Sequence, residues 1–231
     1  YHQTLGDYKA VRRAGLKLIE LIKTRSALTS EIKLSGAYAN LAYNDILLHD
    51  FGSALQNIKK SFLGAGTGSY NHVVITTLKA QAEYFNLNFD AAFDTVDCML
   101  YSAMIKVAPY EECKMEYIKG CVLFNRGEFF KAYHVFSSES ILMDSDPEGW
   151  NIGVRIMCIL CMIELQLDDL ADLSIDSLRK HMNRTNDERY FQPRDKAILK
   201  ILRSLERNSF DFAKTYFKNQ ELFFKLQSDS P

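Results

Sequence analysis

The sequence predicts an all-α protein built from stacked helix pairs, and three observations lead to this fold class. The 231 residues include only 11 glycines and 4 prolines, and this scarcity of helix breakers disfavours an all-β chain with many tight turns. Hydrophobic residues make up 47% of the chain and charged residues 25%, which is an ordinary globular composition. A short residue pattern also recurs about every forty residues. We therefore expect a single helical-repeat domain over residues 1–231.

The repeat consists of an anchor residue followed three positions later by a small residue. The clearest copies pair an aromatic anchor with alanine: Phe51 with Ala54, Phe89 with Ala92, Phe129 with Ala132, and Phe210 with Ala213. Leu170 is the expected anchor of a weaker copy, and Tyr8 is the anchor of a first turn. Successive anchors are 43, 38, 40, 41 and 40 residues apart, which indicates an internal repeat. A small residue also lies nine positions before three of the anchors, at Ala42, Ala80 and Gly120.

Each copy is predicted to form two antiparallel helices. The expected elements are a leading helix over 5–25 and helix pairs over approximately 31–63, 71–105, 111–143, 149–182 and 193–226. In the first pair, apolar residues at helical spacing fill 35–49, Asp50-Phe51-Gly52 interrupts the pattern, and it resumes at Ala54. In the third pair, Gly127 stands where a helix terminator belongs. One pair cannot bury its own apolar face, so neighbouring pairs must stack.

This register resembles the tetratricopeptide repeat family. The best matches are Asn40-Leu41-Ala42 with Phe51 and Ala54, and a second set at Gly120, Leu123, Gly127, Phe129, Ala132 and Phe136. The period is near 40, whereas the family's usual period is about 34, and the bulky first-helix tryptophan is absent. The resemblance implies a right-handed α-α superhelix, or solenoid, of about five antiparallel helix pairs plus a leading helix. It also implies that ligands bind along the concave face formed by the first helix of each pair.

Seven side chains on that concave face are candidates for binding a partner. They combine tyrosines with amide and basic groups: Tyr43, Gln81, Tyr84, Lys114, Tyr117, Asn125 and Arg155. This aromatic and polar mixture is typical of interface anchors. The alternative interpretation is that several of them pack between helices. The basic and asparagine clamp with which some family members hold a terminal carboxylate is not reproduced.

Other motifs have structural interpretations. Cys158 and Cys161 have a CxxC spacing but lie in the most apolar predicted helix, so we expect buried thiols. The glycine-rich segment 64–68 has neither a preceding strand nor a following Gly-Lys-Ser/Thr, and we expect a flexible connector. The five histidines show no metal-binding spacing. We therefore expect a non-catalytic protein without a cofactor or a metal site.

Charge and hydropathy narrow the expected partners. Lys and Arg number 28 and Asp and Glu number 29, so no basic field indicates nucleic acid. The longest apolar run, 156–163, is shorter than the roughly 18 residues that a membrane span needs. Five cysteines without a disulfide pattern indicate a reducing, cytoplasmic compartment.

The sequence thus predicts a scaffold that binds a protein or peptide on its concave face, as part of a larger polypeptide. The alternative is a regulatory or sensor module, whose superhelix responds to a small molecule or short peptide and controls an attached output domain. Aromatic residues near the end of the chain also lead us to expect homodimerisation through the terminal helices.

Overall fold

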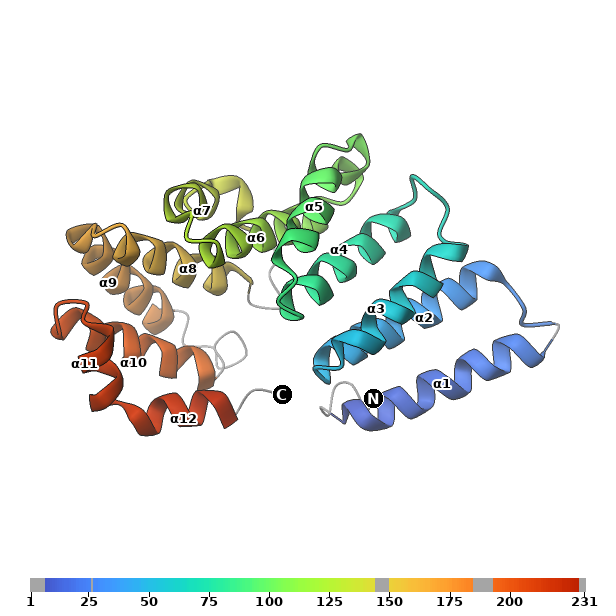
Figure 1. Ribbon diagram of the computed structural model, residues 1–231, viewed down its shortest axis with the longest axis horizontal. Helices are drawn as coiled ribbons and strands as arrows, with labels where there is room; N and C mark the ends of the chain where they lie inside the picture. Colours follow the sequence, from blue (N-terminus) through green and yellow to red (C-terminus); the bar gives the residue numbers. More distant parts are fainter. Residues whose placement is uncertain (1–6, 26, 144–149, 185–192, 229–231) are drawn as a thin grey trace. The chain divides into compact units, whose positions relative to one another are not determined.

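The structure is a computed structural model that describes residues 7–25, 27–143, 150–184 and 193–228 (Figure 1). These residues form twelve α-helices and three 3₁₀ helices and contain no β-strand, which confirms the all-α class for the described part of the chain. The chain divides into two compact units, Tyr1–Asn125 and Arg126–Pro231. The single domain expected over 1–231 is therefore described unit by unit. Residues 5, 6 and 149 of the expected elements lie outside the described residues.

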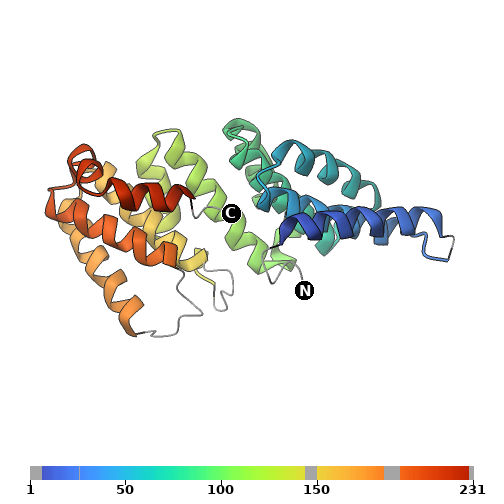
Figure 2. The same cartoon turned by 90° about the horizontal axis from the view of Figure 1, so that it is seen from below.

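In the first unit, each α-helix packs against the next one along the chain. Helix α4 also contacts α2 on one side and α6 on the other, so these three helices form one layer. Figures 1 and 2 show α1, α2 and α3 lying side by side. The elements are α1 (Tyr8–Thr24), α2 (Glu31–Leu47), α3 (Phe51–Ser61), η1 (Phe62–Gly64), α4 (Tyr70–Phe85), α5 (Phe89–Leu100), η2 (Ala103–Val107) and α6 (Pro109–Asn125).

Small residues lie at the helix contacts of the first unit. Ala42 and Ala54, on the paired helices α2 and α3, are both 0% exposed and belong to one apolar cluster. Ala80 and Ala92, on α4 and α5, are likewise 0% exposed and share a second cluster. Gly120 is buried in α6. Short side chains at these positions allow the backbones to approach closely, and larger apolar residues fill the surrounding space.

The second unit has one apolar cluster that joins its helices. Ile159 and Ile175, which are each 1% exposed, and Leu202, which is 2% exposed, bring α8, α9 and α10 together. Tyr133 of α7 packs against the edge of this cluster, and Ala132 is 0% exposed. The elements are α7 (Phe129–Phe136), η3 (Glu139–Ile141), α8 (Trp150–Glu164), α9 (Asp168–Arg184), α10 (Pro193–Arg207), α11 (Phe212–Lys218) and α12 (Gln220–Ser228).

A left-handed residue follows the first helix of each pair. Such residues have φ between 54° and 75°, and they are His49, Leu87, Gly127, Gln166 and Ser209. After His49, Leu87, Gln166 and Ser209, the next residue donates its N–H to a carbonyl five positions earlier: Asp50 to Asp45 (2.9 Å), Asn88 to Glu83 (2.9 Å), Leu167 to Met162 (2.9 Å) and Phe210 to Leu205 (2.8 Å). These bonds satisfy carbonyl groups that the end of a helix would otherwise leave without a partner.

The last two pairs differ from the expected register by two residues. Helix α9 begins at Asp168, so the buried small residue is Ala171 (0% exposed), whereas the expected anchor Leu170 is 45% exposed. The acidic residues Asp168 and Asp169 occupy the first turn of the helix, where the macrodipole favours negative charge. An exposed leucine inside that turn therefore does not mark the beginning of the helix.

The difference at the last pair has another cause. Ser209 and Phe210 are both left-handed, so the turn gains a residue and α11 begins at Phe212. Thr215, which is 0% exposed, then takes the buried position, whereas the expected Ala213 is exposed. The expected anchor Phe210 lies in the turn and packs against the apolar cluster of the second unit.

The glycine-rich connector after α3 includes a close backbone contact. A Cβ atom on Gly64 would lie 2.2 Å from the carbonyl oxygen of Glu31, at the beginning of α2. By contrast, a Cβ atom on Gly66 would meet nothing within 4 Å. Gly64 therefore serves the packing of η1 on α2, which the expectation of a purely flexible connector did not include.

Candidate functional site

Three of the seven candidate residues meet on the adjacent helices α4 and α6. The Asn125 amide group, Nδ2, donates to the Tyr84 hydroxyl oxygen over 3.1 Å and to the Cys121 carbonyl oxygen over 2.9 Å. Tyr84 and Tyr117 are both hydrogen-bonded to the Cys121 side chain. Tyr84, Tyr117 and Asn125 therefore surround one thiol, with Asn125 exposed and both tyrosines half-buried.

The Cys121 thiol at the centre of this group is unreactive. Cys121 is 4% exposed, and burial raises its pKa to about 12, although the hydrogen bonds from Tyr117 and Tyr84 oppose the shift. Burial also raises the pKa of the Tyr84 hydroxyl. Both groups are therefore protonated at neutral pH, and a protonated thiol is a poor nucleophile. The arrangement suits hydrogen bonding and packing.

Aromatic rings extend this group across two neighbouring turns. The Phe85 ring stacks on Phe51 with centroids 5.9 Å apart and meets the Tyr84 ring edge-on at 5.3 Å. Tyr84 also contacts Phe89, at 5.7 Å. Phe85 is 50% exposed. We call Phe51, Tyr84, Phe85, Tyr117 and Asn125 the Tyr84 surface.

Three other candidates in the first unit make contacts within the fold. Gln81 is 8% exposed, and Tyr43 packs against the apolar cluster of α2, α3 and α4. The Lys114 side chain is 12% exposed; its Nζ lies 3.6 Å from a Glu111 carboxylate oxygen and 4.4 Å from the centre of the Tyr110 ring. The alternative interpretation, packing between helices, therefore describes Gln81 and Tyr43 better, whereas these contacts of Lys114 lie within its own helix, α6.

Two buried polar pairs between α-helices were not among the candidates. The Asn57 amide donates to Asp45 over 2.8 Å, and the Thr95 hydroxyl donates to Glu83 over 2.7 Å. In both pairs the acceptor lies six residues before the first residue of the second helix and the donor six residues after it. This shared spacing of polar residues within the repeat is a signal that sequence reasoning could have used.

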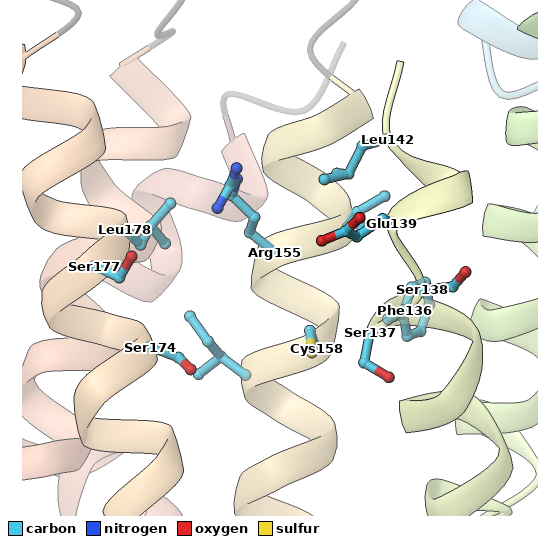
Figure 3. A pocket seen from close by; sticks show the side chains of 12 residues that line it. Phe136, Ser137, Ser138, Glu139, Leu142, Arg155, Cys158, Ser174, Ser177 and Leu178 are labelled. Carbon is cyan, nitrogen blue, oxygen red and sulfur yellow. The ribbon is translucent and has the colours of Figure 1, made fainter. Parts of the chain in front are cut away.

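The structure places Arg155 in a cavity of the second unit. The cavity holds about 190 Å³ and lies among α7, the segment with η3, α8 and α9 (Figure 3). Arg155 is thirteen residues before the first residue of α9, and the residues at the same distance before α3, α5 and α7 are Tyr38, Thr76 and Glu116. Because α9 begins two residues earlier than expected, Arg155 does not occupy a position equivalent to the other candidates.

In comparisons with known proteins, no family model, curated protein or solved structure matches the chain. Within the described ranges, no helix is both long enough and apolar enough to cross a membrane. The same residues contain no group of three or more His, Cys, Asp or Glu side chains arranged to hold a metal ion. The functional interpretation therefore depends on the contacts within each unit.

Proposed function

We propose that this protein is a non-catalytic helical-repeat scaffold, similar to the tetratricopeptide repeat family, that binds an extended peptide segment of a partner protein. The observation that carries the proposal is the Tyr84 surface, where the exposed and oriented amide group of Asn125 adjoins the exposed Phe85 ring and half-buried tyrosine rings on α4 and α6. Binding by a solenoid uses such surfaces, formed by successive repeats.

Three regularities support the repeat itself. The left-handed residues His49, Leu87, Gly127 and Gln166 are 38, 40 and 39 residues apart. Fully buried alanines recur at the same position of α3, α5, α7 and α9. The buried polar pairs recur at one spacing in the first two helix pairs. A helix pair repeated about every forty residues accounts for all three.

The amide group of Asn125 is oriented for recognition of a peptide backbone. Its Nδ2 atom donates hydrogen bonds to the Tyr84 hydroxyl and the Cys121 carbonyl, and these two bonds fix the plane of the amide. Its Oδ1 atom accepts no hydrogen bond from the described residues and is available to a peptide N–H. Phe85 then offers apolar area to a side chain of the same peptide. Orientation before binding lowers the entropic cost of association.

Selection from a displayed random peptide library tests this proposal. We expect enrichment of peptides that bind the 231-residue chain, and we expect Asn125→Ala to weaken their affinity at least tenfold. Phe85→Ala should have a similar effect because aromatic anchors commonly contribute about 2 kcal/mol or more to binding. Asn40→Ala, at an exposed position of α2, is the matched control and should bind like the wild type.

The proposal is contradicted if no peptide is enriched, or if enriched peptides bind Asn125→Ala and the wild type equally. Circular dichroism of each variant must show the helical content of the wild type. Asn125 is exposed, so its truncation is expected to leave the fold intact.

The cavity that Arg155 lines supports the alternative function, a regulatory module that responds to a small molecule. Homodimerisation through the terminal helices also stays a prediction. Phe217 on α11 and Phe224 on α12 are 72% and 60% exposed, which is apolar area that a second copy would cover.

A further inference from the structure

The cavity of the second unit combines apolar walls with a polar opening. Phe136, Val154, Ile159 and Leu178 are each at most 3% exposed and form the apolar part. Its volume of about 190 Å³ is roughly that of six water molecules at about 30 Å³ each. A molecule the size of a single amino acid fits this space.

Figure 3 shows which side chains give the cavity its polarity. Arg155 and Cys158 project from α8 at the centre of the view. Ser174 and Ser177 of α9 lie on one side, and Ser137, Ser138 and Glu139 lie on the other. Hydroxyl groups therefore flank one positive and one negative side chain.

Among the residues that the structure describes, no counter-ion pairs with the guanidinium group of Arg155. Its Nε atom is buried and has no hydrogen-bond partner among the described residues. Burial and the positive charge of Arg155 together lower the pKa of His181. A buried N–H without a partner is unfavourable, and a planar guanidinium binds a carboxylate through two parallel hydrogen bonds. An anionic ligand would satisfy this group.

The carboxylate of Glu139 lines the same cavity and is also unpaired. Neither Glu139 nor Arg155 forms an ion pair with a described residue. A phosphate or a simple carboxylic acid would be attracted by Arg155 but repelled by Glu139. A ligand that carries both an ammonium and a carboxylate group would complement the two charges at once.

From this pair of unpaired opposite charges in one small cavity, we propose that the second unit binds a free α-amino acid. Arg155 holds its carboxylate, Glu139 holds its ammonium group, and the apolar wall of Phe136, Val154 and Leu178 receives its side chain. Ser177 also lines the cavity, whereas the Ser174 hydroxyl donates to the Met162 sulfur over 3.5 Å. The inference rests on the alternative regulatory function and is independent of peptide binding at the Tyr84 surface.

Isothermal titration of the 231-residue chain with each of the twenty L-amino acids tests the site. At least one amino acid should bind saturably, and Arg155→Gln should weaken it at least tenfold. Arg179→Gln removes a positive charge from α9 outside the cavity lining and should bind like the wild type. Because Arg155 Nε has no hydrogen-bond partner among the described residues, the melting temperature of unliganded Arg155→Gln should not fall.

The carboxylate of Glu139 allows a second test, which measures recognition of the ammonium group of the ligand. The wild type should prefer the amino acid to its N-acetylated form at least tenfold, and Glu139→Gln should abolish this preference. Failure of all twenty amino acids to bind overturns the proposal. So does binding that Arg155→Gln leaves unchanged, or binding of inorganic phosphate or of the N-acetylated form as tight as that of the amino acid. Peptide selection on the Tyr84 surface is read separately, so either proposal can fail without the other.

Discussion

The hydroxyl group of Thr95 connects the buried carboxylate of Glu83 to the partly exposed side chain of Lys79 in the first unit. It accepts a hydrogen bond from Lys79 over 2.8 Å and donates one to Glu83 over 2.7 Å. Glu83 is 7% exposed and Thr95 is 8% exposed. A carboxylate at this depth is tolerated only when hydrogen bonds and a counter-ion replace the water it has lost. Thr95 therefore joins α5 to α4 through a bond that depends on the register of the pair.

Replacing Thr95 with valine should destabilise the protein by about 1–3 kcal/mol, because the shape is kept while Glu83 loses a buried hydrogen bond. Urea unfolding followed by circular dichroism measures the loss. Thr77→Val is the matched control. Thr77 is 2% exposed, but its hydroxyl donates to the Val73 carbonyl oxygen within the same helix, and such bonds add little to helix stability. Equal losses in the two variants would contradict the role given to Thr95.

Residue spacing predicted part of the candidate site. Tyr84, Tyr117 and Asn125 were chosen from their positions relative to the anchors, and they meet around Cys121. Lys114 was chosen by the same rule but pairs with Glu111. Spacing places a residue on a face of its helix, whereas the burial of that face depends on side chains of neighbouring elements. Such neighbours cannot be read from a single period.

At the scale of the helix, the turns carry more information than the anchors do. An aromatic anchor marks the beginning of α3, α5 and α7. Helix α9 begins at Asp168, which is not aromatic. Its turn still resembles the turns before α3, α5 and α7, because the left-handed Gln166 lies two residues before the helix. The all-α class and the beginnings of α3, α5 and α7 could be predicted because helical periodicity and the aromatic anchors are local signals. The first residues of α9 and α11 could not be predicted, because the sequence does not indicate a left-handed conformation at a glutamine, serine or phenylalanine.

A non-glycine residue in the left-handed region carries a steric cost of about 1–2 kcal/mol. Gln166 has φ 57° and an exposed side chain, so Gln166→Gly should stabilise the protein. We expect a gain of about 0.5–1 kcal/mol, because the greater freedom of glycine in the unfolded chain offsets part of the relief.

Gly127→Ala provides the opposite case, since Gly127 has φ 75° and a Cβ atom there would meet nothing within 4 Å. The free energy of unfolding of the Gly127→Ala variant should fall by about 1 kcal/mol from backbone strain alone. The two variants are compared by their urea midpoints. A destabilised Gln166→Gly would show that the glutamine side chain contributes to the turn in some other way.

At the scale of the whole molecule, three residues at the same distance before a following helix line cavities of different chemistry. Tyr38, Thr76 and Arg155 occupy the same position in their pairs, and each lines a cavity. The cavity at Tyr38 holds about 400 Å³, and that at Thr76 about 480 Å³. Lys23 and Lys60 lie over the Tyr38 ring, so the charges there already have an aromatic partner. The side chain at this position thus differs between copies, whereas a fully buried alanine recurs in α3, α5, α7 and α9.

The division into two units predicts that residues 1–125 fold and bind alone. The apolar clusters built on α1 to α6 are formed by side chains of that unit, and its length is typical of an independent domain. The fragment should show helical circular dichroism and a cooperative thermal transition.

Because the fragment includes the whole Tyr84 surface, it should bind the peptides selected on the 231-residue chain with affinities within about threefold, or roughly 0.7 kcal/mol. The amino acid that binds at Arg155 should give no heat with it, since Arg155 and Glu139 belong to the other unit. A fragment that is unfolded would contradict the independence of the unit. A folded fragment that does not bind the peptides would instead move the binding surface away from α4 and α6.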